Sequence, residues 1–221
     1  NLGRESLRKN KMIFKIVIFI YESASKYFDA LINSLNNQSD LDFGVILFND
    51  NLTNVNTIFS KLKMNYEIIN LNSESPQDIR FEGLEILKKH KDFYFIFQDC
   101  DDLMELNRVE IIRRFSTKYK VIVNDLTTIN ENGLKVDKNI WKFRLDKKEF
   151  GSYNIKDYNF VGLGNTAIDG NLLNYLPKNP ENKILAVDWY LFYCILNDSK
   201  IKGFFTSDTT TLYRQHNNNS I

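Results

Sequence analysis

The sequence predicts an α/β fold, in which a Rossmann-like and mostly parallel sheet carries a mixed α/β cap. Short runs rich in Ile, Val and Phe alternate with segments of helical periodicity over residues 13–97. Acidic residues lie just beyond two of these runs, Asp50 after the second and Asp99, Asp101 and Asp102 after the fourth. After residue 120 the alternation stops, and turn residues join the apolar runs directly. Strands that alternate with helices form parallel sheets, whose ligands bind beyond the carboxyl ends of the strands.

The first half of the chain contains four predicted strands separated by three predicted helices. Residues 13–20 form a buried strand, and the helix over residues 24–36 gathers its apolar residues on one face. Ser75 and Pro76 start the third helix, because serine caps a helix and proline fits its first turn. The other strands are predicted over residues 43–48, 66–71 and 93–97, and the other helices over residues 58–62 and 75–89.

The second half is predicted to form the cap. Its strands are expected at residues 120–129, 136–145 and 204–213, and its helices at residues 168–175 and 184–196. A turn at Glu131-Asn132-Gly133 joins the first two of these strands. The predicted organisation is one domain with two halves, residues 12–118 and residues 119–221, preceded by residues 1–11 as a flexible tail or cloning remnant.

The composition limits the classes of function. A chain of 221 residues with 43% hydrophobic content can bury one substantial core. Its 29 basic and 28 acidic residues nearly balance, which argues against nucleic-acid binding. The apolar run at residues 13–21 contains Lys15 and is too short to span a bilayer. Because Cys100 and Cys194 form no disulfide or metal-binding pattern, we expect a cytoplasmic protein. The basic residues within 1–11 leave peripheral contact with the inner membrane face open.

The carboxylates after the fourth predicted strand are the main functional signal. Asp99, Asp101 and Asp102 follow the apolar residues 93–97. Alternate carboxylates at the end of a buried strand suit Mn²⁺ or Mg²⁺, which keeps positions open for phosphate oxygens. Two other interpretations stay open: the carboxylates cap the next helix, or Asp99 is the nucleophile of a haloacid-dehalogenase-type phosphatase. That phosphatase type usually carries its motif on the first strand, with Thr or Val where Leu103 stands here.

Four segments of the first half occur in the order of a known family. They are Ser-Leu-Asn-Asn-Gln-Ser at 34–39, Val-Ile-Leu-Phe-Asn-Asp-Asn at 45–51, Ile-Arg-Phe-Glu-Gly-Leu at 79–84 and Asp-Cys-Asp-Asp at 99–102. Together they resemble the family-two glycosyltransferases, a large inverting family with the GT-A fold. Further along, Asp188-Trp189-Tyr190-Leu191 resembles the segment that supplies the catalytic base in that family. Residues 213–216, Tyr-Arg-Gln-His, are similar to the terminal motif of rhamnosyltransferase-like members.

The resemblance implies a metal-dependent inverting glycosyltransferase that uses Mn²⁺ or Mg²⁺. Such an enzyme moves a sugar from a nucleotide-sugar donor to a hydroxyl of a glycan or lipid-linked acceptor, as in polysaccharide or glycolipid synthesis. Asp188 would be the general base. The resemblance assigns donor binding to Tyr21, Asp50, Arg80 and Asp99, metal binding to Asp101 and His216, and acceptor binding to Trp189 and Tyr190.

Several of these assignments have structural alternatives. Asp50 is also a typical turn residue, Asp188 a typical first-turn helix residue, and aromatic residues on a helix usually belong to the core. Asn49, Asn51 and Phe81 depart from the family pattern, which bears on the identity of the nucleotide. The loop at 162–166 lacks the lysine of a phosphate loop and is interpreted as an acceptor-side loop. A catalytically silent nucleotide-sugar binding module is the second class of function left open.

Overall fold

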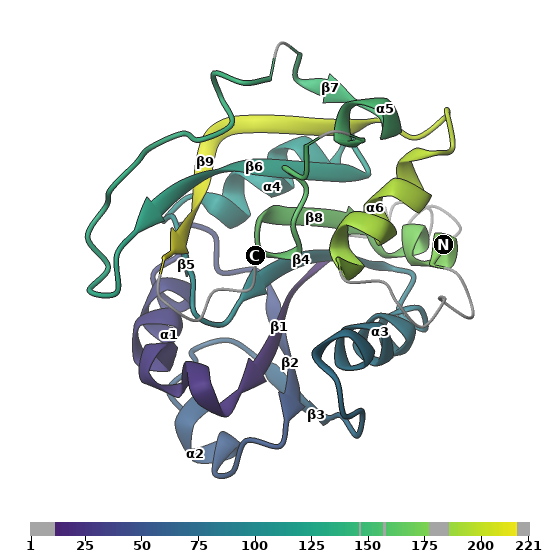
Figure 1. The fold of residues 1–221 in the computed structure, drawn as a ribbon. Helices are drawn as coiled ribbons and strands as arrows, with labels where there is room; N and C mark the ends of the chain where they lie inside the picture. The colour runs from purple at the N-terminus through teal and green to yellow at the C-terminus, as the bar shows by residue number, and fades with distance from the viewer. Residues whose placement is uncertain (1–11, 146, 157, 177–185, 216–221) are drawn as a thin grey trace, which may run out of the picture.

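The computed structural model describes residues 12–145, 147–156, 158–176 and 186–215. Within these residues a nine-stranded sheet has the order β3-β2-β1-β4-β8-β6-β9-β5, and β7 pairs with β9 off this path (Figure 1). The described residues include no helix that combines the length and apolarity needed to cross a bilayer.

The first half forms the parallel part of the sheet, as the alternation predicts. Strands β1 (Ile13–Tyr21), β2 (Gly44–Asp50), β3 (Tyr66–Asn70) and β4 (Phe93–Asp99) all pair in parallel. The pairing places Tyr21 beside Asp50, and Phe19 beside Asp99. The polar ends of β1, β2 and β4 therefore lie along the same edge of the sheet.

The second half makes the sheet mixed. The short strand β8 (Thr166–Asp169) runs antiparallel between β4 and β6 (Val121–Ile129). Strand β9 (Gly203–Arg214) pairs in parallel with β6 and antiparallel with β5 (Leu103–Met104) and β7 (Glu149–Phe150). Because β8 joins β4 to β6, residues from the second half reach the end of β4.

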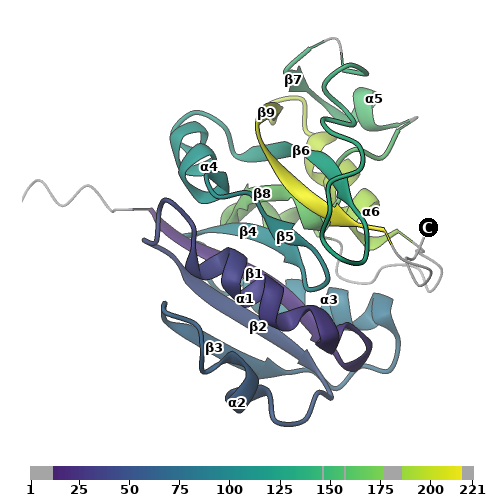
Figure 2. The same cartoon turned by 90° about the vertical axis from the view of Figure 1, so that its left-hand side faces the viewer.

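Helices cover both faces of the sheet (Figure 2). Helices α1 (Phe28–Asn36), α2 (Val55–Phe59) and α4 (Arg108–Ser116) contribute to one apolar cluster, and α3 (Pro76–Leu87), α5 (Ser152–Ile155) and α6 (Val187–Leu196) to the other. Short 3-10 turns complete the order: η1 (Glu22–Tyr27), η2 (Leu163–Asn165) and η3 (Gly170–Tyr175). Alternate residues of β4 feed the two clusters, because successive strand residues point to opposite faces.

Helix α3 begins as the sequence predicts, since Ser75 Oγ accepts a hydrogen bond from the Asp78 backbone N–H at 3.1 Å. The predicted strand at residues 136–145 is wrong: Lys135 forms an isolated bridge with Ile129, but residues 136–145 form no strand. The Asp125 carboxylate binds the N–H groups of Trp141 and Lys142, at 2.8 and 3.1 Å. These N–H groups are consequently engaged by a side chain, and the chain turns there.

The predicted helix at residues 168–175 is wrong in its first part. Residues 166–169 belong to strand β8, and only the 3-10 turn η3 follows. Asp169 Oδ1 accepts a hydrogen bond from the Asn171 N–H at 2.9 Å and caps this turn. These residues form a strand rather than a helix because they pair with both β4 and β6, which places Ala167 and Ile168 in the core.

Candidate active site

The candidate site starts at the turn that follows β4. Asp102 in this turn is buried, and its Oδ1 accepts a hydrogen bond from the Arg214 backbone N–H at 2.7 Å. The Arg214 side chain donates from Nε to the Asp101 carbonyl at 2.7 Å. Burial raises the pKa of Asp102 well above its usual range, and the carboxylates of Asp99 and Asp101 add to this rise. Strand β9, 112 residues further along the chain, therefore fixes the acidic turn.

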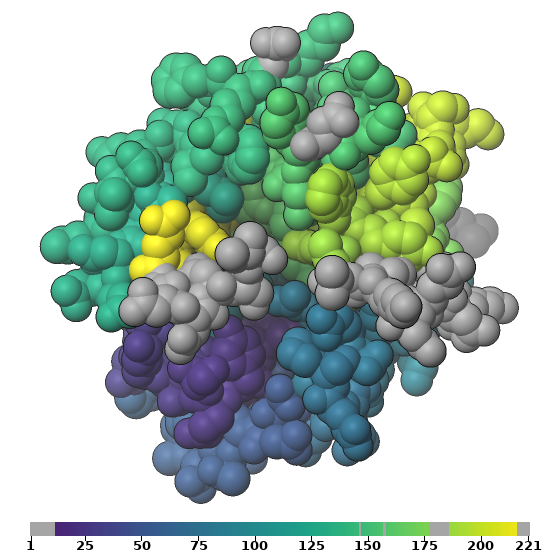
Figure 3. All heavy atoms as spheres, in the orientation of Figure 1, coloured from purple at the N-terminus to yellow at the C-terminus, as the bar shows by residue number. Residues whose placement is uncertain are grey.

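A cavity of about 470 Å³ opens over the end of β4. Residues from both halves of the chain line it, among them Arg80, Asp99, Trp141, Gly164, Asp188 and Trp189. Figure 3 shows the surface of the first half, in purple to blue, meeting that of the second half, in green to yellow. The structure thus brings three of the sequence-predicted polar residues, Arg80, Asp99 and Asp188, to one cavity.

Asp99 is a second perturbed carboxyl group that faces this cavity, beside Asp102. The loss of hydration on burial raises the pKa of Asp99 to about 6. The guanidinium of Arg80 opposes this rise, whereas the carboxylates of Asp101 and Asp188 add to it. A carboxyl with a pKa shifted by burial and by named charges in a cavity is typical of a functional site.

Helix α3 presents Arg80 because it packs closely on the sheet. A methyl group at Gly83 would lie 2.6 Å from Phe19 Cε1 and 3.1 Å from Phe48 Cδ2, so only glycine fits this approach. One turn earlier on the same helix, Arg80 lines the cavity. The neighbouring Glu82 accepts hydrogen bonds from Ser73 N and Oγ, at 3.1 and 2.7 Å, and fixes the loop before the helix.

Arg108 lies completely buried behind the acidic turn. Its Nε donates to Asn124 Oδ1 at 2.8 Å, its Nη2 to the Phe97 carbonyl at 2.9 Å, and its Nη1 to Gln98 Oε1. Burial lowers the pKa of Arg108 to about 9, while Asp102 and Asp99 counteract this effect. The guanidinium is therefore a fixed positive charge beneath the carboxylates.

The acceptor-side loop predicted at residues 162–166 lies against the carboxylates. Asn165 fixes it, because its side-chain amide donates to the Asn124 carbonyl at 2.9 Å and to the Phe160 carbonyl at 3.1 Å. Thr211 Oγ1 donates to the Gly164 carbonyl at 3.0 Å. Gly164 is so close to Asp99 that a methyl group there would overlap Asp99 Oδ2.

We expect Gly164→Ala to displace the Asp99 carboxylate and to weaken nucleotide binding. Overpacking typically costs about 1–3 kcal/mol, which corresponds to a loss of about 5- to 150-fold in affinity if it acts on the bound state. Calorimetric titration with a nucleoside diphosphate and Mn²⁺ measures the effect. Gly151→Ala is the matched control, since its nearest side-chain atom is Lys202 Nζ at 3.7 Å. Equal affinities of the two variants would contradict the positioning role of Gly164.

Asp188, Trp189 and Tyr190 lie in the first turn of helix α6, and only the first two of them line the cavity. Asp188 lies in the first turn and lines the cavity, where its Oδ1 accepts a hydrogen bond from the Trp189 N–H at 2.8 Å. Trp189 also lines the cavity, but its indole N–H donates to the Ile155 carbonyl at 2.7 Å and its ring packs on the core. Tyr190 is not among the residues that line the cavity, and its hydroxyl bonds the Cys194 thiol.

Tyr21 and Asp50 lie side by side at the ends of β1 and β2, outside the lining of the cavity. Burial is the largest cause that raises the pKa of Tyr21, and the nearby Cys100, Asp101 and Asp99 side chains raise it further. The Tyr21 hydroxyl forms a hydrogen bond with the Cys100 thiol. Asn49 has a structural role, because its amide donates to Asn70 Oδ1 at 2.8 Å and accepts from the Leu52 N–H at 3.0 Å. This replacement in the family pattern consequently stabilises the end of β2.

The acidic turn offers carboxylates rather than a complete metal cage. No group of three or more His, Cys, Asp or Glu side chains within the described part of the chain is arranged to hold a metal. Mg²⁺ is usually bound by one or two carboxylates together with substrate phosphates, and Asp99 and Asp101 fit that mode. The buried Asp102 Oδ2 has no hydrogen-bond partner among the described residues and also faces this site. His216, the other predicted ligand, lies outside the described residues.

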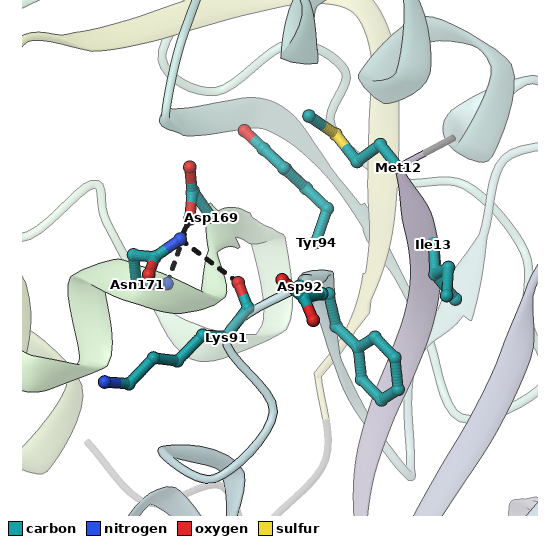
Figure 4. Close-up of a pocket in the computed structure, with 8 residues that line it drawn as sticks. Met12, Ile13, Lys91, Asp92, Tyr94, Asp169 and Asn171 are labelled. Carbon is teal, nitrogen blue, oxygen red and sulfur yellow. Dashed lines mark hydrogen bonds between the residues drawn. The ribbon is translucent and has the colours of Figure 1, made fainter. Parts of the chain in front are cut away.

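A separate cavity of about 390 Å³ lies at the amino ends of β1 and β4 (Figure 4). Met12, Ile13 and Asp169 line it, together with Lys91 and Asn171. The Asn171 amide donates to the Lys91 carbonyl at 3.1 Å and to Asp169 Oδ1 at 2.9 Å, so these polar groups satisfy one another. Since ligands of open α/β sheets bind at the carboxyl ends of strands, the cavity over Asp99 is the candidate active site.

The fold and this site define the chain as a protein with the GT-A fold. Among solved structures it is similar to S. aureus TarS 1–349 in complex with UDP-GlcNAc, with a TM-score of 0.69, 20% identity, and coverage of 94% of this chain and 60% of that one. It is also similar to GalNAc-T7 with UDP, GalNAc and Mn²⁺, with a TM-score of 0.67, 13% identity, and coverage of 94% and 45%. Both are glycosyltransferases with this fold.

At these identities the similarities establish the fold alone. This chain spans 60% of the length of TarS 1–349. No family model and no curated protein sequence matches the chain.

Two residues escape prediction from the sequence: Trp141, which lines the cavity, and Arg108, which is buried behind the acidic turn. Trp141 falls in a segment that the apolar pattern presents as a strand, and its place in the cavity depends on the turn that the Asp125 carboxylate holds. Arg108 follows the acidic motif by only a few residues, but a basic residue at a helix start is usually exposed to solvent. Each acquires its place from long-range contacts.

Proposed function

We propose that the chain is a metal-dependent inverting glycosyltransferase that moves a sugar from a nucleotide-sugar donor to an acceptor hydroxyl. One observation carries the proposal. Arg80, Asp99 and Asp188 come from three separate elements and line one cavity at the carboxyl edge of a GT-A sheet. Arg80 would supply a positive charge for the diphosphate, Asp99 a carboxylate next to the metal, and Asp188 the base.

The donor is expected to lie across the ends of β1, β2 and β4. Asp50 would accept a hydrogen bond from the nucleotide base, with Tyr21 beside it, because a carboxylate suits an N–H donor. Arg80 would bind the diphosphate, as guanidinium groups pair with phosphate oxygens. Asp101, with Asp99 and His216, would hold Mn²⁺ or Mg²⁺. When bound, such a cation neutralises charge on a departing diphosphate.

Asp188 is the proposed general base. In direct inversion a carboxylate removes the proton of the acceptor hydroxyl while its oxygen attacks the anomeric carbon. The bond to the nucleoside diphosphate breaks on the opposite face. Asp188 is suited to this role because it lines the cavity from the first turn of α6, together with Arg80 from α3 and Asp99 from β4.

We extend the proposal to the acceptor and its setting. Trp189 lines the cavity beside Asp188 and would contact the acceptor, which we propose is a glycan or a lipid-linked glycan. The reaction would then serve polysaccharide or glycolipid synthesis in the cytoplasm, at the inner face of the membrane. The phosphatase alternative is disfavoured because Asp99 ends the fourth strand, β4, whereas that type of phosphatase usually carries its nucleophile on the first strand.

A thermal-shift panel of UDP, GDP, dTDP and CMP, each with and without Mn²⁺, tests the proposal. A ligand at a hundred times its dissociation constant adds about 2.7 kcal/mol to the free energy of unfolding. We expect one nucleotide to stabilise the protein in a metal-dependent manner, and Asp101→Ala to abolish this shift. Asp92→Ala, an exposed carboxylate at the opposite edge of the sheet, is the control and keeps the shift.

The outcomes separate the classes of function. Metal-dependent release of nucleoside diphosphate from the sugar donor supports an enzyme, whereas binding without any such release supports a silent binding module. If no nucleotide stabilises the wild-type protein with or without Mn²⁺, the transferase proposal is wrong.

A further inference from the structure

Trp141 is an aromatic residue of the cavity that the proposed reaction does not yet use. It follows β6 in the second half of the chain and lines the same cavity as Asp99 and Asp188. Its indole Nε1 is buried and has no hydrogen-bond partner among the described residues. The second tryptophan of the cavity differs in this respect, because Trp189 Nε1 donates to the Ile155 carbonyl at 2.7 Å.

An unpaired buried N–H group is unusual and costs free energy. Folded proteins pair the large majority of their buried polar groups, and the exceptions often mark a place for a ligand or water. Tryptophan usually finds a partner for its N–H when it is buried. The indole N–H of Trp141 is therefore a donor whose acceptor is not among the described residues, and a ligand oxygen could fill that role.

The position of Trp141 is fixed by its surroundings. A register shift between Asn124 and Asp125 interrupts the pairing of β6 with β9, and such bulges re-aim side chains. Here the Asp125 carboxylate accepts the backbone N–H groups of Trp141 and Lys142, at 2.8 and 3.1 Å. The Phe160 ring lies 6.1 Å from the indole ring, centroid to centroid.

The Arg144 guanidinium lies 5.4 Å from the centre of the Trp141 ring. Backbone and ring are thus both held before any ligand arrives, which limits the entropy lost on binding. The unpaired N–H group belongs to a side chain that is held in place by its neighbours.

We propose that Trp141 binds the sugar that occupies the cavity, with its ring as an apolar wall and its indole N–H as a donor to a sugar oxygen. This inference rests on the proposed function, since it names the residue that recognises the sugar in that site. The required ligand chemistry is a neutral oxygen acceptor, a hydroxyl or acyl oxygen, next to an apolar sugar face. Both the donor sugar and the acceptor sugar carry such groups.

Because the indole ring lines the cavity, a sugar bound there lies against the ring that carries this unpaired nitrogen. A sugar that places an oxygen there gains a hydrogen bond and satisfies the donor. A deoxy sugar that lacks this oxygen leaves the donor unpaired, and sites of this kind reject such analogues strongly. Trp141 is accordingly a specificity-determining residue, with Asp125 as its positioning residue.

The test uses the two indole N–H resonances of the ¹⁵N-labelled protein, assigned with Trp141→Phe and Trp189→Phe. The donor probes are UDP-GlcNAc, UDP-glucose, GDP-mannose and dTDP-rhamnose, each with Mn²⁺ and compared with its nucleoside diphosphate. The acceptor probes are methyl glycosides of glucose, N-acetylglucosamine and rhamnose, added to the protein with bound nucleoside diphosphate. Thermal shifts recorded in parallel establish which probes bind.

We expect a sugar that binds to move the Trp141 resonance and to lose about tenfold in affinity in Trp141→Phe, as for the loss of one hydrogen bond. The nucleoside diphosphate alone should bind both proteins equally. A selective loss for the nucleotide sugar identifies the donor sugar as the ligand of Trp141, and a loss for the methyl glycoside identifies the acceptor. Tyr153→Phe is the control, because it removes a polar group from an exposed ring outside the cavity lining.

A sugar that stabilises the wild-type protein beyond its nucleotide, yet leaves the Trp141 resonance and the affinity of Trp141→Phe unchanged, would overturn this inference. The transferase proposal would survive that result. If no nucleotide and no sugar binds the wild-type protein, the proposed function fails and this inference fails with it. The resonance shift is measured on the wild-type protein, so the test does not depend on the folding of the variant.

Discussion

Replacing Asp188 with asparagine should lower turnover by about 10²- to 10⁴-fold, the usual contribution of a positioned general base. The amide of asparagine fits the same space but cannot remove the proton of the attacking hydroxyl. Nucleotide binding should persist, because Tyr21 and Asp50 lie at the strand ends outside the cavity lining that contains Asp188. Turnover is measured as release of nucleoside diphosphate from the donor, and binding as a thermal shift.

Asp78→Asn is the matched control for Asp188→Asn. Asp78 also lies in the first turn of a helix, but it does not line the cavity. Its replacement removes a comparable helix-terminal charge and should leave turnover at the wild-type level. Wild-type turnover in Asp188→Asn would show that a different group removes the proton.

Replacing Arg108 with methionine should lower the free energy of unfolding by about 3–5 kcal/mol, the typical cost of removing one partner from a buried charged network. The substitution leaves three acceptors without their donor, at Gln98, Asn124 and the Phe97 carbonyl. It also removes the positive charge that faces Asp99 and Asp102. Urea unfolding monitored by circular dichroism gives the difference in free energy.

Arg114→Met on the same helix provides the comparison. Arg114 is largely exposed and pairs with Asp208 at 2.5 Å on the surface. Exposed ion pairs contribute about 0–1 kcal/mol, so this variant should stay close to the wild type. Equal losses in the two variants would mean that Arg108 stabilises the fold no more than a surface arginine does.

The parallel half of the fold could be predicted because local hydrophobic patterns in the sequence indicate each of its strands and helices in order. Each apolar run of β1 to β4 is short and bounded, and helical segments separate the runs. The same logic places Asp50 and Asp99 at one edge of the sheet, since parallel strands end on the same side. The family resemblance adds Arg80 and Asp188, which the structure brings to one cavity.

The rest of the site depends on contacts between distant residues. Gly164 reaches Asp99 because the short strand β8 inserts antiparallel beside β4, a pairing that no local pattern announces. Residues 136–145 have the composition of a strand, but the Asp125 carboxylate binds two of their N–H groups and turns the chain. Local propensity is a weak guide where a buried side chain competes for the backbone in this way.

The hydrogen bonds between Arg214 and the acidic turn join a late segment of the chain to an earlier one. Asp101 and Asp102 belong to the first half, yet their partner is the end of β9. During synthesis the carboxylates emerge before β9 and remain without these hydrogen bonds until β9 has formed. Assembly of the complete site therefore requires β9 as well as the first half of the chain. Residues 12–118, although they contain every acidic residue of the turn, lack the strand that fixes it.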